Sequence, residues 1–338
     1  MKKIFPFLLI FLLFLPGCSA SSRQTSESSS IYLTAMDTVM LLTAYGPHRQ
    51  EALECAQAEI TALDSLLSVG NPNSEISRLN ATGSGQLSEE IELLFSQALS
   101  LSRDTEGLFD PTVHPLVKLW GFYDKAYHVP TSQELSQVLE RVDYRRVTFD
   151  PDTGAVTLGA GQSIDLGGIG KGFTSQRVTE IMKASGVTSA MLSLGGNIQC
   201  LGSKPDGSPW NIGIRNPWSQ TGELYCAVQV QDQAVITSGG YERYFVEDGV
   251  TYLHILDPRT GFPAQSGLSS VSIVTSNGTL GDGLSTALYI MGLEKGSDYW
   301  RAHRDAFEAI FIADDGSLYA TSGLQGRITS QETIQYIE

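Results

Sequence analysis

Most strand-forming segments lie in the second half of this chain and follow one another in runs. Six segments there are rich in β-branched and aromatic residues and read as strands: 223–231, 234–239, 241–247, 251–257, 268–275 and 307–313. Four segments carry apolar residues mainly at helical spacing: 51–67, 88–103, 131–141 and 172–185. Because the helices are segregated from the strand runs, the pattern predicts an α+β fold rather than a doubly wound sheet.

Shorter signals complete this pattern. Residues 145–159 alternate around a PDTG turn and predict a hairpin, and residues 187–196 predict a strand that runs into a glycine turn. One more helix is predicted from Asp282, and 307–313 is the last expected strand. The sequence has no repeat of 20–50 residues and no second linker, so residues 31–338 are predicted to form a single domain.

The N-terminus has the pattern of an export signal. Lysines at 2 and 3 precede an apolar run at 4–16, which is too short for a membrane span and typical of a secretory signal. The run leads into LPGC at 15–18, which is similar to a bacterial lipobox, whose cysteine is lipidated. We predict a signal peptide at 1–17 and a lipidated Cys18, followed by a serine-rich tether, so that 18–30 attach an extracytoplasmic domain to the bacterial membrane. An ordinary secretory signal with a chance cysteine is the alternative.

The net charge and the cysteine content argue against several classes of function. The formal net charge of −15 and the lack of a basic stripe argue against nucleic-acid binding. An acidic protein that binds a phosphorylated ligand needs local positive charge, and a bound cation is one source. Cys55, Cys200 and Cys226 are too widely spaced for a disulfide framework or a zinc site. Buried free thiols are expected, and one disulfide remains open.

The segment DLGGIGKG at 165–172 places four glycines around one lysine. The glycines predict a loop before the helix at 172–185. Glycine lets a backbone approach a ligand closely, and a lysine in such a loop suggests a phosphate. The common phosphate motifs do not fit, because a P-loop needs glycine at Asp165 and a hydroxyl at Gly172. The dinucleotide motif needs a glycine at Phe173. The segment alone therefore does not identify its ligand.

Several motifs occur together with this segment. They are SEISRLN (74–80), FDPTVHPLVKLWGF (109–122), SLGGN (193–197), TSGGYERYF (237–245), HILDPRTG (254–261) and GDGLSTAL (281–288). In this order they resemble the FAD:protein FMN transferase family, the ApbE-type flavin transferases, over about residues 31–330. The resemblance implies a single T-fold-like α+β domain. It also implies that FAD is cleaved at its pyrophosphate, that FMN passes to a threonine or serine hydroxyl of an acceptor protein, and that AMP leaves.

The resemblance implies a magnesium site, with Mn²⁺ as a further possibility. Its ligands are the Asp282 carboxylate, the Thr286 hydroxyl and the Gly168 carbonyl. Asp282 and Thr286 are spaced i,i+4 and share one face of a helix. Mg²⁺ prefers six oxygen ligands and takes few from protein, which leaves positions for phosphate oxygens. The alternative is that Asp282 caps the helix while Thr286 binds a neighbouring carbonyl.

The resemblance also implies the FAD contacts and the base. Met36, Asp165, Lys171 and Ile255 match FAD-contacting positions, with Lys171 neutralising phosphate charge. His254 is the predicted base for the acceptor hydroxyl, since an unperturbed imidazole titrates near neutral pH. A solvated lysine and a structural histidine are the alternatives for Lys171 and His254.

The implied acceptor is a membrane redox-complex subunit or extracytoplasmic flavoprotein with a Ser/Thr-Gly-Ala-Thr-like motif. Two positions depart from the family pattern: Asp37 replaces a usual glycine, and Gly70 replaces a frequent aromatic residue. An aromatic ring there would stack on the flavin or adenine, and its loss would admit water. Two other functions therefore stay open: a Mg²⁺-dependent FAD pyrophosphatase that yields FMN and AMP, and a non-catalytic FAD-binding lipoprotein.

Overall fold

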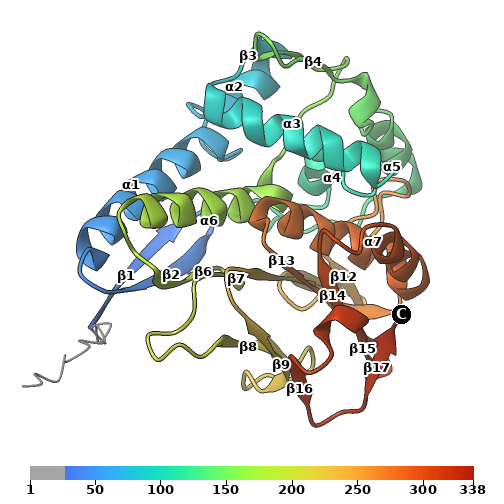
Figure 1. Cartoon of the computed structure of the whole chain (residues 1–338). Helices are drawn as coiled ribbons and strands as arrows, with labels where there is room; N and C mark the ends of the chain where they lie inside the picture. The colour runs from blue at the N-terminus through green and yellow to red at the C-terminus, as the bar shows by residue number, and fades with distance from the viewer. Residues whose placement is uncertain (1–26) are drawn as a thin grey trace, which may run out of the picture.

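The computed structural model describes residues 27–338, and its centre is a nine-stranded sheet in the order β1-β2-β6-β7-β10-β13-β14-β15-β17 (Figure 1). Neighbouring strands are antiparallel except β15 and β17. The strands are β1 (Ser28–Ala35), β2 (Thr38–Tyr45), β6 (Ser189–Leu194), β7 (Asn197–Leu201), β10 (Ala234–Gly239), β13 (Leu268–Thr275), β14 (Glu308–Ala313), β15 (Leu318–Thr321) and β17 (Ile334–Ile337). This largely antiparallel sheet confirms the predicted α+β class.

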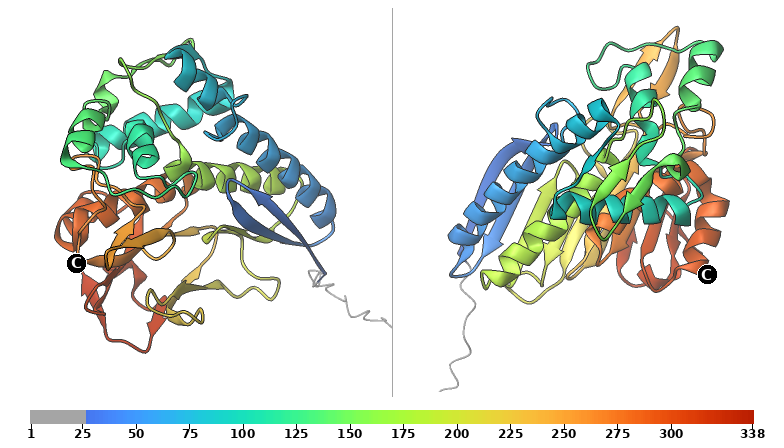
Figure 2. Two further views of the ribbon diagram at one scale, coloured as in Figure 1. Left: turned by 180° about the vertical axis from the view of Figure 1, so that it is seen from behind. Right: turned by 90° about the horizontal axis from the view of Figure 1, so that it is seen from above.

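Three helices cover one face of this sheet (Figures 1 and 2). They are α1 (Arg49–Leu67), α6 (Gly167–Ala184) and α7 (Gly278–Ala302). Met40 and Leu42 of β2 are fully buried together with Leu53 and Ile60 of α1. The apolar stripe of each helix is thus removed from water against the sheet, which is the main stabilising term for such a layer.

A further layer includes α3 (Glu89–Asp104), which lies above α6 and α7 in Figure 1. Its predicted stripe, which includes Ile91, Leu94, Phe95 and Ala98, is fully buried. The remaining elements of this layer are α2 (Glu75–Thr82), β3 (Ser84–Gln86), η1 (Pro111–Val113), α4 (His114–Leu119), α5 (Ser132–Leu139), η2 (Tyr144–Arg146), β4 (Thr148–Asp150) and β5 (Ala155–Thr157). The predicted 145–159 hairpin is therefore confirmed as β4 and β5, with β3 as a third strand.

The opposite face of the large sheet is covered by a small sheet. Its strands are β8 (Trp210–Arg215), β9 (Leu224–Val230) and β16 (Ile328–Ser330), and the short η3 (Ser322–Leu324) lies before β16. Cys200 and Cys226 are buried between the two sheets as free thiols, as expected, whereas Cys55 is exposed and that expectation was wrong. Burial raises the pKa of both Cys200 and Cys226 to about 12.

A separate hairpin, β11 (Tyr244–Glu247) and β12 (Val250–Leu253), packs on an aromatic cluster. The ring of Phe245 stacks between Tyr127 and Tyr252, with centroid distances of 4.8 and 5.2 Å. Trp120 lies against Phe245 and Tyr252. The aromatic contacts fix the position of the chain on either side of the hairpin, at residues 243 and 254.

The predicted boundary between the tether and the domain is corrected. Residues 28–30, assigned to the tether, belong to β1, where Ser28 pairs with Tyr45 and Ser30 Oγ lies 2.8 Å from Thr43 Oγ1. An edge strand with one solvated face accommodates serines, which hid it from a search for apolar runs. The predicted signal peptide and Cys18 lie outside the described residues. No helix within 27–338 is long and apolar enough to cross a membrane.

Candidate active site

Helices α6 and α7 approach each other closely at two glycines. A Cβ added to Gly172 would lie 2.2 Å from the Gly278 carbonyl oxygen and 2.6 Å from Asp282 Cβ. The segment 167–172 forms the first turns of α6, and none of its glycines has a positive φ. The expectation of a glycine loop was therefore wrong, because Gly172 serves close helix packing.

The close approach of α6 and α7, called the α6–α7 crossing below, positions Asp282, which is 5% exposed to solvent. Its Oδ2 accepts a hydrogen bond from the Gly172 amide at 2.8 Å, and its Oδ1 accepts one from Asn197 Nδ2 at 2.9 Å. The helix begins four residues earlier, where Asn277 Oδ1 accepts from the Leu280 amide. The alternative that Asp282 caps α7 is therefore wrong.

No lysine or arginine within residues 27–338 forms an ion pair with Asp282. Both of its oxygens accept N–H donors, which is the bonding pattern of an ionised carboxylate. A buried charge is normally paired or bound to a metal. The surroundings of Asp282 thus fit a carboxylate that binds a cation.

The other two predicted ligands flank Asp282. Thr286 lies one turn further along α7, and its Oγ1 is 3.2 Å from Ser238 Oγ of β10. Gly168 lies one turn before Gly172 on α6, and the Gly172 amide donates to Asp282. The three groups are a carboxylate, a hydroxyl and a carbonyl, which are oxygen ligands of the kind that Mg²⁺ prefers. Among the described residues there is no cluster of three or more His, Cys, Asp or Glu that could hold a metal, so this mixed set is the candidate.

His254 follows β12 directly, and Arg243 precedes β11. The Arg243 carbonyl lies 3.0 Å from His254 Nδ1 and 3.1 Å from the His254 amide nitrogen. Because a carbonyl only accepts hydrogen bonds, Nδ1 carries the proton and Nε2 keeps a free lone pair. Burial, the Arg243 guanidinium and the Lys171 ammonium lower the pKa of His254 to about 3. The imidazole is therefore neutral near pH 7, as a base must be.

Asp165 is held just before α6. Its Oδ2 accepts a hydrogen bond from the Tyr123 hydroxyl at 2.5 Å, and its Oδ1 accepts one from the Gly167 amide at 2.7 Å. Burial, followed by the charge of Asp165, raises the pKa of Tyr123, and the Arg243 guanidinium opposes that shift. Arg243 therefore acts electrostatically on both Tyr123 and His254, which places Asp165 on the same side of the molecule as the proposed base.

Met36 occupies the tight turn between β1 and β2. Met36 and Asp37 both have left-handed φ angles, 50° and 57°, as in a two-residue type I′ hairpin turn. Aspartate tolerates this conformation better than most residues, so the turn forms despite the missing glycine. Met36 Sδ lies 3.7 Å from Thr174 Oγ1 of α6, which places Met36 beside the helix that carries Lys171.

The structure thus links most of the predicted site residues. The hydrogen bond from Gly172 to Asp282 joins α6, which carries Gly168, to α7, which carries Asp282 and Thr286, and charges couple Lys171 to His254. Ile255 differs, because its side chain is 5% exposed and belongs to the central core cluster. Its FAD contact remains a prediction.

Three residues that belong to this site are absent from the set of site residues predicted from the sequence. Asn197 donates a hydrogen bond to Asp282, and Tyr123 donates one to Asp165. The Arg243 carbonyl accepts one from His254. Asn197 ends the SLGGN motif and Tyr123 directly follows the 109–122 motif, so both positions carried a signal. Their partners, 85 and 42 residues away, became visible only in the fold.

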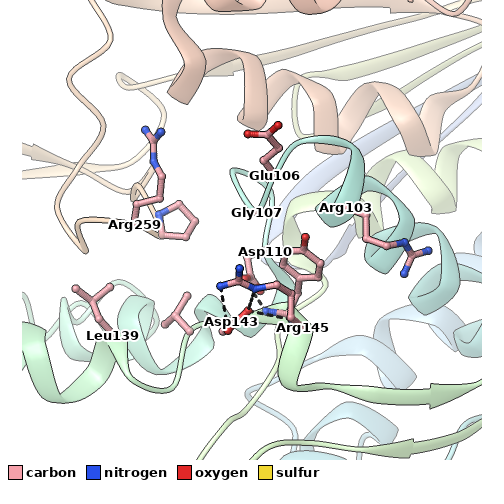
Figure 3. A pocket seen from close by; sticks show the side chains of 11 residues that line it. Arg103, Glu106, Gly107, Asp110, Leu139, Asp143, Arg145 and Arg259 are labelled. Carbon is pink, nitrogen blue, oxygen red and sulfur yellow. Dashed lines mark hydrogen bonds and ion pairs between the residues drawn. The ribbon is translucent and has the colours of Figure 1, made fainter.

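Two cavities lie apart from these contacts. One, of about 450 Å³, lies between the end of α3, η2 and residues 258–259, where Asp143 bonds Arg145 (Figure 3). A second, of about 570 Å³, is lined by His114, Lys118 and Arg141 among others. Neither is lined by a predicted site residue. The contacts of Asp282 and His254, rather than these cavities, define the candidate site.

Comparisons with known proteins identify the family. The ApbE family model matches residues 36–311. An FAD:protein FMN transferase from Treponema pallidum is 33% identical, and the alignment covers 92% of this chain and 91% of the relative. An FAD:protein FMN transferase from Vibrio cholerae is 31% identical, and the alignment covers 94% of this chain and 96% of the relative. Among solved structures, an ApbE protein from Thermotoga maritima aligns with a TM-score of 0.84 at 28% identity, covering 90% of this chain and all of its own. The flavin transferase ApbE from Vibrio cholerae aligns with a TM-score of 0.78 at 28% identity, over 89% and 100%. The chain belongs to the ApbE family.

Proposed function

We propose that this protein is an FAD:protein FMN transferase, which moves the FMN moiety of FAD onto a protein hydroxyl and releases AMP. Family membership and relatives with this activity support the proposal. The main structural support for the proposal is that the candidate site contains both a carboxylate suited to a cation and a histidine suited to act as a base. Asp282 is a buried carboxyl group without a cationic partner in the described chain, and His254 presents an unprotonated Nε2.

The chemistry follows from these groups. The acceptor serine or threonine oxygen attacks the phosphorus on the FMN side of the pyrophosphate. Its proton passes to His254 Nε2, and the bond from that phosphorus to the bridging oxygen breaks as AMP leaves. The Arg243 carbonyl holds the Nδ1–H, so the imidazole keeps the tautomer and orientation that the proton transfer needs.

Gly168, Asp282 and Thr286 would hold a divalent cation, Mg²⁺ or Mn²⁺. When bound, that cation supplies positive charge to the oxygens of the phosphate groups. Lys171 and Arg243 are the protein's own cations near His254. Because the FAD pyrophosphate is anionic, its binding offsets these charges and raises the proton affinity of His254. The base therefore strengthens when FAD is present.

We also propose the location and the acceptor. The leader and Cys18 support a lipoprotein on the outer face of the bacterial membrane. An extracytoplasmic acceptor with a Ser/Thr-Gly-Ala-Thr-like motif, such as a membrane redox-complex subunit, suits that position. FAD must then reach the site outside the cytoplasm.

The test is mass spectrometry of an acceptor domain incubated with the protein, FAD and Mg²⁺. We expect a covalent mass gain of one FMN and one AMP released per adduct. Omission of the metal, Asp282→Ala and His254→Ala should each abolish the adduct. FAD that stays bound and intact in every reaction would contradict the transferase and favour a non-catalytic FAD-binding lipoprotein.

One observation favours FAD hydrolysis as a second activity. Gly70 is exposed, and a side chain added there would meet only Ser68 Oγ, at 3.8 Å. The position has room for the aromatic ring that many family members carry, so the absence of that ring leaves space for water. Gly70→Tyr should raise the ratio of adduct to free FMN in the same assay. An unchanged ratio would mean that this position does not control water access.

A further inference from the structure

We infer that Asn197 is a positioning residue that holds the Asp282 carboxylate ready for the divalent cation. This inference rests on the metal site of the proposed function. Asn197 Nδ2 donates to Asp282 Oδ1 at 2.9 Å, and the two residues are 4% and 5% exposed. The bond joins strand β7 to helix α7 across 85 residues of sequence.

The position of Asn197 is fixed by a tight turn. Gly195 and Gly196 have φ angles of 61° and 95° and connect β6 to β7, where Asn197 pairs with Leu194. A Cβ on Gly195 would lie 2.5 Å from Thr38 Oγ1, so only glycine fits against the neighbouring strand. The SLGGN motif thus forms a turn that places the Asn197 side-chain amide next to Asp282.

The register of β7 decides which side chains face the helices. Asn197 reaches Asp282 of α7, while Gln199 Oε1 lies 2.9 Å from a Cβ placed on Gly278 of the same helix. Ile198 and Cys200 belong to the cluster on the opposite face of the sheet. Asn197 and Gln199 are therefore two buried amides on one face of one strand, and only Asn197 bonds the carboxylate.

The two hydrogen bonds of Asp282 are complementary. Gly172 holds Oδ2 from α6 and Asn197 holds Oδ1 from β7, so the carboxylate plane is fixed from both sides. Each oxygen retains further acceptor capacity, because a carboxylate offers about four lone-pair sites. Residues that orient a metal ligand commonly contribute 10- to 100-fold in metal affinity. Loss of the Asn197 donor should have an effect of this size.

The experiment measures Mn²⁺ affinity by electron paramagnetic resonance, separately from FAD binding. Asn197→Ala removes the donor, and Asn197→Leu removes it while it keeps the volume. We expect both to weaken Mn²⁺ binding by about 10- to 100-fold. At saturating Mn²⁺ the kcat for FMN transfer should return toward the wild-type value, which a general loss of structure would not allow.

Gln199→Ala is the matched control, since it removes a buried amide from the same face of β7 without touching Asp282. It should lower the melting temperature as Asn197→Ala does but leave Mn²⁺ affinity unchanged. Wild-type affinity in Asn197→Leu, or equal weakening in Gln199→Ala, would overturn the inference while the metal site stands. A wild-type protein that binds no Mn²⁺ would overturn the metal site itself. Asn197→Leu decides the question if Asn197→Ala fails to fold.

Discussion

At the scale of single residues, one carbonyl decides how His254 behaves. The Arg243 carbonyl fixes the proton on Nδ1, while burial and then the Arg243 side chain disfavour a second proton on the ring. The same residue therefore selects the basic nitrogen and keeps it free. Sequence indicated the histidine through the HILDPRTG motif, but not this arrangement, because Arg243 and His254 meet only when the β11–β12 hairpin closes.

The depressed pKa of His254 predicts a pH-dependent stability. Its value of about 3 in the folded protein lies below the ordinary histidine value near 6.5, so the unfolded chain binds more protons between these limits. This contribution to stability is present above about pH 6.5 and is lost as the pH falls toward 3. His254→Asn should therefore show a smaller drop in melting temperature than wild type between pH 7.5 and pH 4.5.

The comparison needs a control for the loss of one histidine. His303→Asn removes an exposed histidine at the end of α7, whose ring nitrogen Nδ1 lies 2.7 Å from the Tyr299 carbonyl oxygen. For each of the three proteins, the change in melting temperature between the two pH values is compared. Parallel pH dependences for wild type and His254→Asn would contradict the assignment of a neutral, desolvated imidazole to this site.

At the scale of elements, the sequence predicts the helices and strands whose apolar residues follow a regular period. It does not predict which helices pack closely against each other. The segment 268–275 was predicted as a strand and matches β13, and the stripe of 88–103 matches α3 within one residue, because burial imposes a simple period on both. The edge strand β1 begins SSS and carried no such signal. The glycines of 165–172 suggested a loop, because nothing local to the sequence shows that Gly278 packs against Gly172.

The α6–α7 crossing gives the second prediction. Gly172→Ala places a methyl group 2.2 Å from the Gly278 carbonyl oxygen, so the helices must separate. We expect destabilisation by roughly 3 kcal/mol, as for severe overpacking, together with weaker Mn²⁺ binding as the amide leaves Asp282. Urea unfolding and Mn²⁺ titration would measure the two effects.

Gly170→Ala is the matched control on the same helix. Its Cβ would meet only Leu67 Cδ1 at 3.5 Å, an ordinary contact, and alanine favours helix over glycine by about 0.5–1 kcal/mol. We expect this variant to be as stable as wild type or more stable. Equal stability of the two alanine variants would show that helix contact at Gly172 is not limiting.

At the scale of the whole molecule, the sheet sets the distance between the proposed anchor and the site. Nine residues, 19–27, separate Cys18 from β1, and at full extension this link spans at most about 35 Å. β1 then runs eight residues to the Met36–Asp37 turn beside α6, about 27 Å at strand spacing. If Cys18 anchors the protein, an acceptor hydroxyl must be presented within roughly 60 Å of the membrane surface.

Membrane attachment should therefore raise the rate of FMN transfer to membrane-bound acceptors and leave the rate for soluble acceptors unchanged. Replacing residues 1–18 with a cleavable secretory signal that lacks the cysteine should release the protein from the membrane fraction. Transfer to a soluble acceptor domain in vitro should stay unchanged, because residues 27–338 contain the whole candidate site. In cells, labelling of a membrane acceptor should fall, since both proteins lose the high effective concentration of a shared surface. Covalent flavin fluorescence of the acceptor in denaturing gels would measure this, and equal labelling by the anchored and released forms would show that attachment does not serve acceptor encounter.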